Sequence, residues 1–424
     1  MLNCLVTLSA YAFLPELVKL CKQQYNKLFI LSTCLLFSLH PVHTEPVISI
    51  VGRADLLAAL FFIVTCLFTL WFNPDSFIGI VFKHFIISLL SFVSMLCKEQ
   101  GILVLLFVFP LLLVKNREKM FSKNTCFFIL FVVLNIFFFS WFRLKVGNYQ
   151  FPQFQRGDNP TAFEAKFLDR ILSFNYINAL NLGILICPIW LCFDWALGCI
   201  PPLNPLDSRV CFVFGFWFIL FLFLVKIYFE VKNGEYFLGL SMGLLIIPFL
   251  LCLNIFVNVG FVIAERNLFL PLLGYSLLYH IGLTTLTKHV KTKLVYVFHT
   301  ILLIIILLRT CIRSSAWRQE NILYRTGLTV CPGNGKVHYN IAKILDQENK
   351  RSQAILFYSE AVRLGEIHSN KGVRSVTSYL IVTLISIKPW LNSCIADLHY
   401  VTIRKINVFY YAHKKALRSE LLIN

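Results

Sequence analysis

Residues His40 to Asp55 form a dense polar segment between two apolar runs of the chain. Ionisable side chains are expensive to hold at or near membrane depth, so such a segment is a functional hypothesis by default. Cations in it could bind a phosphate anion, and carboxylates could accept a proton. The candidate residues of this segment are His40, His43, Glu45, Arg53 and Asp55.

Four further polar islands interrupt the apolar chain, and each is a candidate for substrate binding. A Lys-Glu pair lies between two short apolar runs, a long loop carries Asp-Asn-Pro, Phe-Asp-Trp follows a proline, and Glu-Arg-Asn precedes another apolar run. Together they offer the cations and carboxylates that phosphate binding and proton transfer need. The candidate residues are Lys98, Glu99, Asp158, Asn159, Asp194, Glu265 and Arg266.

The two histidines and the first glutamate need a separate test as a metal site. Their spacing is His40-x-x-His43-x-Glu45, and imidazole and carboxylate ligands suit zinc or manganese. Pro41 separates the histidines, so they need not share a helix face as the i, i+4 pair of a helical zinc motif does. Direct contact with a phosphate or an acceptor, and structural capping, are the alternatives. We assign no metal to this segment.

Other candidates have equally simple structural interpretations. Asp55 can act as a favourable charge at the N-terminus of the following helix. Lys98 and Glu99 can neutralise each other at a helix junction. Asp158 can belong to an ordinary turn, since Asp, Asn and Pro are typical turn residues. The functional interpretation therefore requires that side chains from different islands converge in space.

The composition identifies a multi-pass membrane protein. Of 424 residues, 58% are hydrophobic and 14% charged, which a soluble globule could not spread over its surface. Apolar runs that approach the ~20 residues of a spanning helix must be helical, because lipid satisfies no backbone hydrogen bond. We expect an all-α bundle of about eight to ten spans. The runs are Ala54–Phe72, Ile78–Cys97, Gly101–Val114, Cys126–Phe142, Val210–Val225, Phe237–Val257, Leu268–Leu286 and Leu294–Leu308.

The net charge of +18 comes from basic clusters between the apolar runs, which argues against nucleic-acid binding. The positive-inside rule places these clusters in the cytoplasm. If every apolar run crossed the membrane, the third basic cluster would fall on the non-cytoplasmic side, so one run must turn back. We expect Asn181–Leu197, which contains Pro188, to be this re-entrant or interfacial run. All polar islands then share the opposite face with everything after Ile312. The clusters are Lys19, Lys22 and Lys27; Lys115, Arg117, Lys119 and Lys123; and Lys288, Lys291 and Lys293.

The chain divides into regions of different composition. Residues 1–312 form the membrane domain, with a non-cytoplasmic loop at 143–178, and 313–334 form a polar linker. Residues 335–365 fit one tetratricopeptide repeat, in which Ala342 and Ala354 let two helices approach closely; a simple helical hairpin is the alternative. Residues 366–424 are unassigned. The 14 cysteines lack paired metal spacing and are interpreted as small hydrophobic residues.

Seven short strings occur in order along the chain and together resemble the transmembrane and tetratricopeptide repeat-containing O-mannosyltransferases. The resemblance runs from about Leu2 to Leu364, and the collinear order makes it specific. The strings are His40-Pro-Val-His-Thr-Glu45, Gly52-Arg-Ala-Asp-Leu-Leu57, Lys98-Glu-Gln-Gly-Ile102, Asp158-Asn-Pro160, Phe193-Asp-Trp195, Glu265-Arg-Asn-Leu268 and Trp317 with Cys331-Pro332 before the repeat.

The resemblance implies a GT-C glycosyltransferase of the endoplasmic reticulum membrane with luminal repeats. Such enzymes transfer mannose from dolichyl phosphate mannose to Ser or Thr of secretory-pathway proteins, notably cadherin-type domains, without another cofactor. The family's general base is expected in a luminal loop after a first span, whereas this sequence enters at the second span and carries one repeat. We therefore assign no catalytic residue. We expect Arg266, Lys98 and Arg53 to bind phosphate, and His40, His43, Glu45 and Asp158 to position substrate.

Three functions remain open at this point. A transferase predicts contact between the polar islands beside a lipid-phosphate groove, and this chain would be an active or an inactive form of it. A non-catalytic membrane adaptor would use the repeat to hold a protein partner. A transporter predicts two similar halves, and the sequence shows no such internal symmetry.

Overall fold

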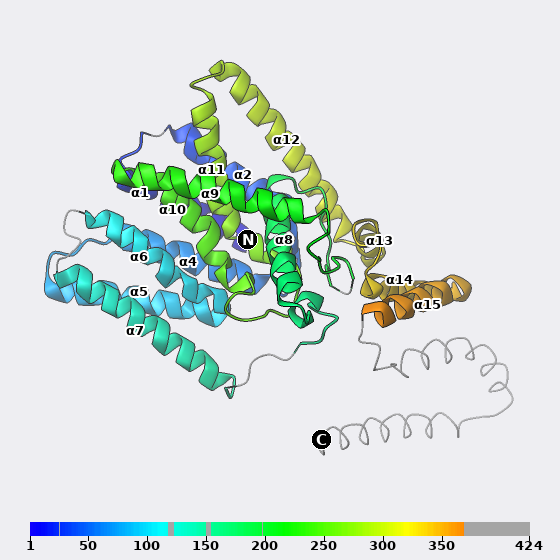
Figure 1. The fold of residues 1–424 in the computed structure, drawn as a ribbon. Coiled ribbons are helices and arrows are strands. Elements are labelled where there is room, and N and C mark those ends of the chain that lie inside the picture. The colour runs from blue at the N-terminus through cyan, green and yellow to red at the C-terminus, as the bar shows by residue number, and fades with distance from the viewer. Residues whose placement is uncertain (25, 118–122, 150–153, 197, 369–424) are drawn as a thin grey trace. The chain divides into compact units, whose positions relative to one another are not determined.

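The computed structural model describes residues 1–24, 26–117, 123–149, 154–196 and 198–368; Lys119 and the tail from residue 369 lie outside this range. The described residues form helices and no strand, which confirms the expected all-α class (Figure 1). They divide into a unit that ends at Val337 and a second that begins at His338. The helices are α1 (Leu2–Leu20), α2 (Lys27–Leu39), α3 (Thr44–Ile48), α4 (Arg53–Trp71), α5 (Phe77–Cys97), α6 (Val104–Lys115), α7 (Lys123–Val146), α8 (Phe167–Ile186), α9 (Val210–Lys232), α10 (Phe237–Ile246), α11 (Pro271–Leu286), α12 (Thr292–Ala316), α13 (Glu320–Val330), α14 (Gly335–Gln347) and α15 (Arg351–His368).

Short 3-10 turns connect several of these helices at the polar islands. They matter because each carries candidate site residues or lies directly beside them. They are η1 (Pro41–His43), η2 (Glu99–Leu103), η4 (Pro160–Phe163), η5 (Ile247–Cys252) and η6 (Glu265–Leu268).

Five of the described helices, α4, α5, α7, α9 and α12, are long and apolar enough to cross a membrane. Other apolar runs form shorter elements. Gly101–Val114 becomes η2 and the 12-residue α6, and Phe237–Val257 is divided between α10 and η5. Leu105, Phe107 and Val108 of α6 are fully buried in the protein. An apolar run alone cannot distinguish a helix that faces lipid from one enclosed by other helices.

Helix α4 lies at the centre of the bundle. It packs against α1, α5 and α6, and 56% of its apolar window is buried inside the protein. The fully buried rings Phe13 of α1, Phe62 of α4 and Phe107 of α6 fill the spaces between these helices. By contrast, only 11% of α9 and 17% of α12 are buried. Their exposed apolar surfaces are suited to lipid.

Two kinds of contact hold α11 in place. Gly274 lies so close to α10 that an added Cβ would be 2.2 Å from the backbone nitrogen of Leu245. The hydroxyl of Ser32 in α2 lies 2.6 Å from Nε2 of His280 in α11 and 2.5 Å from Nε2 of His299 in α12. Within lipid, the hydrophobic effect does not drive helices to associate, so buried polar contacts of this kind help to join them.

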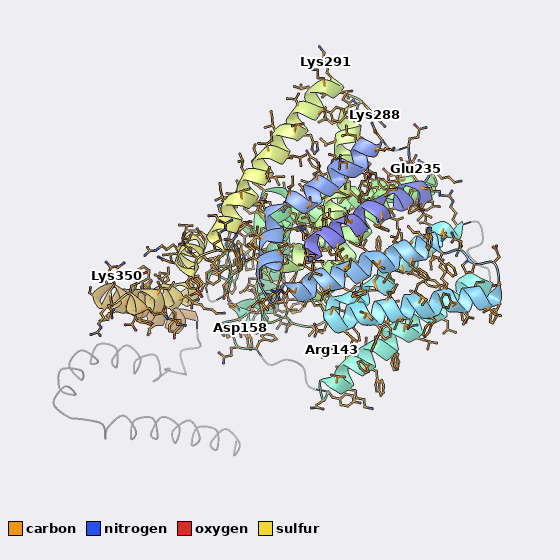
Figure 2. All side chains as sticks on the ribbon, turned by 180° about the vertical axis from the view of Figure 1, so that it is seen from behind. Arg143, Asp158, Glu235, Lys288, Lys291 and Lys350 are labelled. Atoms are coloured by element: carbon orange, nitrogen blue, oxygen red, sulfur yellow. A yellow bond between two sulfur atoms is a disulfide. The ribbon has the colours of Figure 1, made fainter. Side chains whose placement is uncertain are left out.

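The two ends of the bundle carry different residues. Figure 2 shows Glu235, Lys288 and Lys291 at one end, and Arg143 and Asp158 at the other. The basic cluster between α11 and α12 thus lies away from the loop between α7 and α8, as the expected topology requires. Helix α11 runs from η6 to this basic cluster, so η6 lies at the end opposite the lysines.

The helix bounds differ from the expected segment boundaries at three places. Helices α7 and α8 extend into the expected loop at 143–178, so the connection covers only residues 147–166. Residues 181–186 of the proposed re-entrant run are the last turns of α8, and its remaining described residues form turns rather than a helix. Helix α12 continues to Ala316, beyond the expected boundary at 312, and the linker contains α13. Polar residues along α8 and at the end of α12 concealed these helices.

The second unit contains most of α14 and all of α15, which three residues connect. Ala342 and Ala354 are fully buried, as the close approach of two repeat helices requires. The rings of Tyr339 and Tyr358 meet edge to face with centroids 5.6 Å apart. This helical pair is what one tetratricopeptide repeat would contribute.

Candidate functional site

Glu45 and Arg266 are joined by a two-point contact between α3 and η6. One carboxylate oxygen of Glu45 accepts a hydrogen bond from Nη1 of Arg266 at 3.1 Å, and the other accepts one from its backbone N–H, also at 3.1 Å. Glu45 is buried, whereas 31% of the Arg266 side chain is exposed. Burial raises the pKa of the Glu45 carboxyl, and the Arg266 guanidinium opposes that rise. The guanidinium is therefore the accessible partner of this pair.

Lys98 connects α4 to η6. Its ammonium is paired with the carboxylate of Asp55, in the first turn of α4, and donates a hydrogen bond to the side-chain oxygen of Asn267 at 2.6 Å. Gly101, three residues further on, makes this placement possible, because a Cβ there would be 2.3 Å from the backbone of Ser94. Islands that lie far apart in the sequence are thus brought into direct contact.

Glu265 and Arg313 form the most deeply buried of the ion pairs. Their side chains are 1% and 3% exposed, and Nη2 of Arg313 lies 3.6 Å from Oε2 of Glu265. The other oxygen of Glu265 accepts hydrogen bonds from the backbone N–H of Cys192 at 2.6 Å and from the indole of Trp195 at 3.3 Å. Burial raises the pKa of Glu265 to about 7, although Arg313 opposes the rise.

A small cavity lies beside the two accessible cations. It measures about 20 Å³, room for about one water molecule rather than for a sugar phosphate. Charged and polar groups line one part of it, and apolar residues of α4, η5, the start of α11 and the two positions before α11 line the other. Its lining residues are Asp55, Ala58, Ala59, Phe62, Lys98, Gln100, Gly101, Pro248, Arg266, Asn267, Phe269, Leu270 and Pro271.

The two histidines are enclosed by the protein. Nδ1 of His40 accepts a hydrogen bond from the backbone N–H of Val42, so its Nε2–H is the donor to the carbonyl of Leu185, 3.1 Å away. His43 packs against the rings of Phe37 and Phe269, with centroids 4.6 and 4.2 Å away. Burial lowers the pKa of both imidazoles, that of His40 to about 4. Capping, one of the alternatives from the sequence, describes the contacts of His40.

No metal-binding arrangement occurs within the described ranges, where no three or more His, Cys, Asp or Glu side chains lie close enough to hold an ion. His40, His43 and Glu45 instead point to different partners, which are Leu185, two phenylalanine rings and Arg266.

Lys98 and Glu99 do not neutralise each other, which contradicts the simple interpretation of that pair. Lys98 pairs with Asp55, whereas Glu99 pairs with Arg143, and both members of this second pair are about half exposed. The 3-10 turn that begins at Glu99 directs the neighbouring side chains to different partners. Arg53 is exposed at the start of α4 and makes no ion pair with any described residue.

Asp158 and Asn159 lie in the connection between α7 and α8. The Asp158 carboxylate accepts the backbone N–H of Gln155 at 3.0 Å, which closes a turn. The fully buried Asn159 donates to the carbonyl of Val259 at 2.8 Å and to the side-chain oxygen of Asn254 at 3.2 Å. These contacts fasten the loop to the segment before η6.

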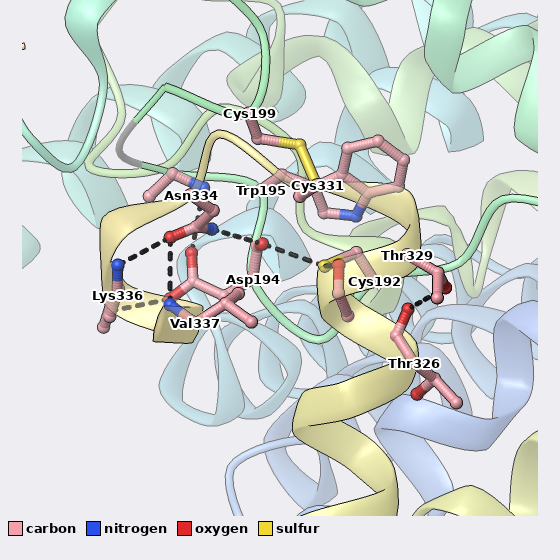
Figure 3. Close-up of a disulfide and its surroundings, with 12 residues drawn as sticks. Cys192, Asp194, Trp195, Cys199, Thr326, Thr329, Cys331, Asn334, Lys336 and Val337 are labelled. Carbon is pink, nitrogen blue, oxygen red and sulfur yellow. Dashed lines mark hydrogen bonds and ion pairs between the residues drawn. A yellow bond between two sulfur atoms is a disulfide. The ribbon is translucent and has the colours of Figure 1, made fainter. Parts of the chain in front are cut away.

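Asp194 belongs to a contact between the loop after α8 and the start of α14. It pairs with Lys336 at 2.7 Å, and a disulfide joins Cys199 to Cys331 nearby (Figure 3). These two cysteines are therefore not simply small hydrophobic residues, as the sequence suggested. Their separation of 132 positions in the sequence concealed the pairing.

Arg313 is the main residue that sequence reasoning missed. We placed it at the start of a polar linker, but it lies inside α12, and its counter-ion is 48 positions earlier in the chain. The only signal was its position just after a long apolar run, four residues beyond Arg309. Because the Arg313 side chain is 3% exposed, its charge requires a buried partner, which is Glu265.

Three of the ion pairs form one cluster of cations and carboxylates at one end of the bundle. Lys98, Arg266 and Arg313 supply three positive charges, and ionised Glu45, Asp55 and Glu265 would supply three negative charges. An anion that enters the cluster can therefore pair with one of these cations only by displacing its carboxylate partner. The two cations that line the cavity, Lys98 and Arg266, are the ones available for this exchange.

Comparisons with known proteins find relatives of this chain. The family model described as "Protein O-mannosyl-transferase TMTC, DUF1736" matches residues 148–221. Protein O-mannosyl-transferase TMTC4 of Mus musculus is 39% identical over 357 residues, covering 76% of this chain and 48% of the relative. Protein O-mannosyl-transferase F38B6.6 of Caenorhabditis elegans is 33% identical, covering 78% and 45%. Protein O-mannosyl-transferase TMTC3 of Homo sapiens is 31% identical, covering 82% and 40%. No solved structure matches the chain.

The fold and the site define a polytopic, helical membrane protein with a cluster of ion pairs at one end of its bundle. By these matches, the chain is similar over most of its length to the TMTC family of protein O-mannosyl-transferases, as its motifs predicted. It spans about half the length of the curated relatives it matches.

Proposed function

We propose that the chain acts in protein O-mannosylation, transferring mannose from dolichyl phosphate mannose to Ser or Thr of secretory-pathway proteins such as cadherin-type domains. The observation that carries this proposal is the convergence of Lys98, Arg266 and Asp55 on one cavity. Cations suit the phosphate, and apolar residues on the same cavity suit the start of a polyprenyl chain. The lipid-linked sugar is the donor, and we invoke no further cofactor.

The reaction needs one bond to form as another breaks. The acceptor hydroxyl oxygen attacks the anomeric carbon of mannose, the bond from that carbon to the phosphate oxygen breaks, and a carboxylate takes the hydroxyl proton. Lys98 and Arg266 would stabilise the negative charge that develops on the departing lipid phosphate. We assign no residue of this chain as the base.

Binding of the donor requires the cavity to open. Its present volume of about 20 Å³ is too small for a sugar phosphate, so the side chains that line it must move. Arg266 and Lys98 are the partly exposed members of their ion pairs, at 31% and 19%. Their long, flexible side chains can turn toward an incoming phosphate while Glu45 and Asp55 stay in place.

We place the site on the luminal side of the endoplasmic reticulum membrane. The Cys199–Cys331 disulfide supports this, because disulfides persist in oxidising compartments such as that lumen. The separation of the basic cluster of Lys288 and Lys291 from Asp158 supports the same orientation, since basic loops favour the cytoplasmic side (Figure 2).

The test is mannosyl transfer by microsomes that contain the full chain, with labelled dolichyl phosphate mannose and a cadherin domain as acceptor. We expect transfer by the unaltered chain and a loss of about 100-fold or more in Arg266→Gln, since a hydrogen-bonded charge is worth about 1.5–3 kcal/mol and more at a developing charge. The control is Arg143→Gln, an exposed arginine that pairs with Glu99. No transfer by the unaltered chain would reject the proposal and favour the membrane adaptor.

A further inference from the structure

A network of contacts holds the loop after α8 against the segment that leads into α14. We call the described residues of these two segments, 192–196 with 198–199 and 327–337, the junction. The Cys199–Cys331 disulfide joins them covalently. Asn334 donates to the carbonyl of Asp194 at 2.9 Å and also accepts the backbone N–H of Lys336 at 2.9 Å, which caps the first turn of α14 (Figure 3). All of these residues belong to the first unit.

Side-chain packing makes the junction tight. An added Cβ on Gly327 would be 2.8 Å from the ring of Phe193, so the two segments touch without any space between them. Phe193 also packs against Tyr324 of α13, with ring centroids 5.0 Å apart. The ion pair of Asp194 with Lys336, at 2.7 Å, closes the contact on its more exposed side.

Glu265 connects this junction to the cation cavity. One of its oxygens accepts the backbone N–H of Cys192 and the indole N–H of Trp195, and both donors belong to the junction. The next two residues, Arg266 and Asn267, line the cavity. All three lie in the four-residue turn η6, so a shift of Glu265 must also move its two neighbours.

We propose that the Cys199–Cys331 disulfide locks the junction onto Glu265, and that Glu265 is a positioning residue through which the junction sets the place of Arg266 and Asn267. The bond forms by thiol–disulfide exchange with a protein disulfide of an oxidising compartment, which takes up two electrons and two protons. While the disulfide is present, residues 327–337 and the cavity residues of η6 are held in fixed positions relative to each other. Reduction releases residues 327–337 and makes η6 more mobile.

Thiol mapping on the full chain, purified in lipid nanodiscs, tests the covalent part. After denaturation without reductant, Cys199 and Cys331 should not react with a maleimide, whereas the exposed Cys311 should. After reduction, both should react. Full labelling of Cys199 and Cys331 without reductant would overturn the proposal.

Hydrogen exchange tests the positioning part without any sugar donor, so its result is independent of mannosyl transfer. Mild reduction of the folded protein should speed exchange of the Cys192 amide and of the η6 amides at least tenfold. The Cys331→Ser variant should do the same, and Cys311→Ser, which changes a free and exposed cysteine, should not. Unchanged exchange after reduction would overturn the lock.

Substitutions of Glu265 separate positioning from general packing. Glu265→Ala removes the acceptor of the Cys192 and Trp195 hydrogen bonds, so exchange of the Cys192 amide should rise at least tenfold. Glu265→Gln keeps an acceptor oxygen in the same place and should restore most of the protection. Equal exchange in the two variants would reject the role of this side chain.

Discussion

Replacing Asp55 with Asn should strengthen the binding of a lipid phosphate. Asp55 forms an ion pair with the Lys98 ammonium and is itself almost fully buried, with 5% of its side chain exposed. A phosphate that reaches Lys98 must displace this carboxylate. Asparagine has nearly the same shape and no charge, so it removes the competitor while the contact of Lys98 with Asn267 remains.

The size of the effect follows from the contact that is lost. A hydrogen bond to a charged group contributes about 1.5–3 kcal/mol, and each 1.4 kcal/mol is a factor of about ten in affinity. Because 19% of the Lys98 side chain is exposed, solvent weakens the pair only partly. We expect binding about 10- to 150-fold tighter in Asp55→Asn.

The assay is the binding of a short-chain polyprenyl phosphate to the purified chain in nanodiscs, measured by calorimetry. Lys98→Gln should weaken binding, and Glu99→Gln should leave it unchanged, because Glu99 pairs with the exposed Arg143 instead. Thermal unfolding would verify that each variant is folded. Weaker or equal binding in a folded Asp55→Asn variant would refute the exchange of partners at Lys98.

Two further predictions concern stability. Gly274→Ala should destabilise the bundle by several kcal/mol, because the new methyl group would lie 2.2 Å from the backbone nitrogen of Leu245. Gly282→Ala on the same helix should not, because no atom lies within 4 Å of its added Cβ. Equal melting temperatures of the two variants in detergent would contradict this packing. The folded-state pKa of Glu265 is about 7, above its ordinary value of 4.5. The folded state therefore binds more protons than the unfolded state between these values, and stability from this group falls as pH rises from about 5 to 7.5. Relative to Glu265→Gln, the unaltered protein should be more stable at pH 5 than at pH 7.5 in chemical unfolding; a pH-independent difference would show that Glu265 stays ionised.

Much of the fold could be predicted from local patterns. The apolar runs at Ala54–Phe72 and Ile78–Cys97 become α4 and α5 almost to the residue, because a long apolar segment in lipid has to be helical. The polar stretch from Gly335 becomes a helical pair for a similar local reason. The predictions were wrong where local composition was ambiguous, as at α8, whose polar residues made it resemble a loop.

The candidate site was less predictable, because partner choice depends on three-dimensional packing. Lys98 stands next to Glu99 in sequence and yet pairs with Asp55. Arg313 lay outside every motif that we singled out, but it is the counter-ion of Glu265. Cys199 and Cys331 showed no recognisable spacing, and only the fold brings their Cα atoms to 4.8 Å.

The sequence by itself determined the class of protein, the helical architecture and the polar islands that interrupt it. These follow from the free energy of placing apolar and charged groups in lipid, which depends on the composition of each segment and not on its neighbours in the fold. Only the tertiary structure decided which charge meets which, because a buried ion pair is stable only when packing brings both members out of water together. That choice divided twelve candidate residues among a cluster of ion pairs at one end of the bundle, the junction and several other positions.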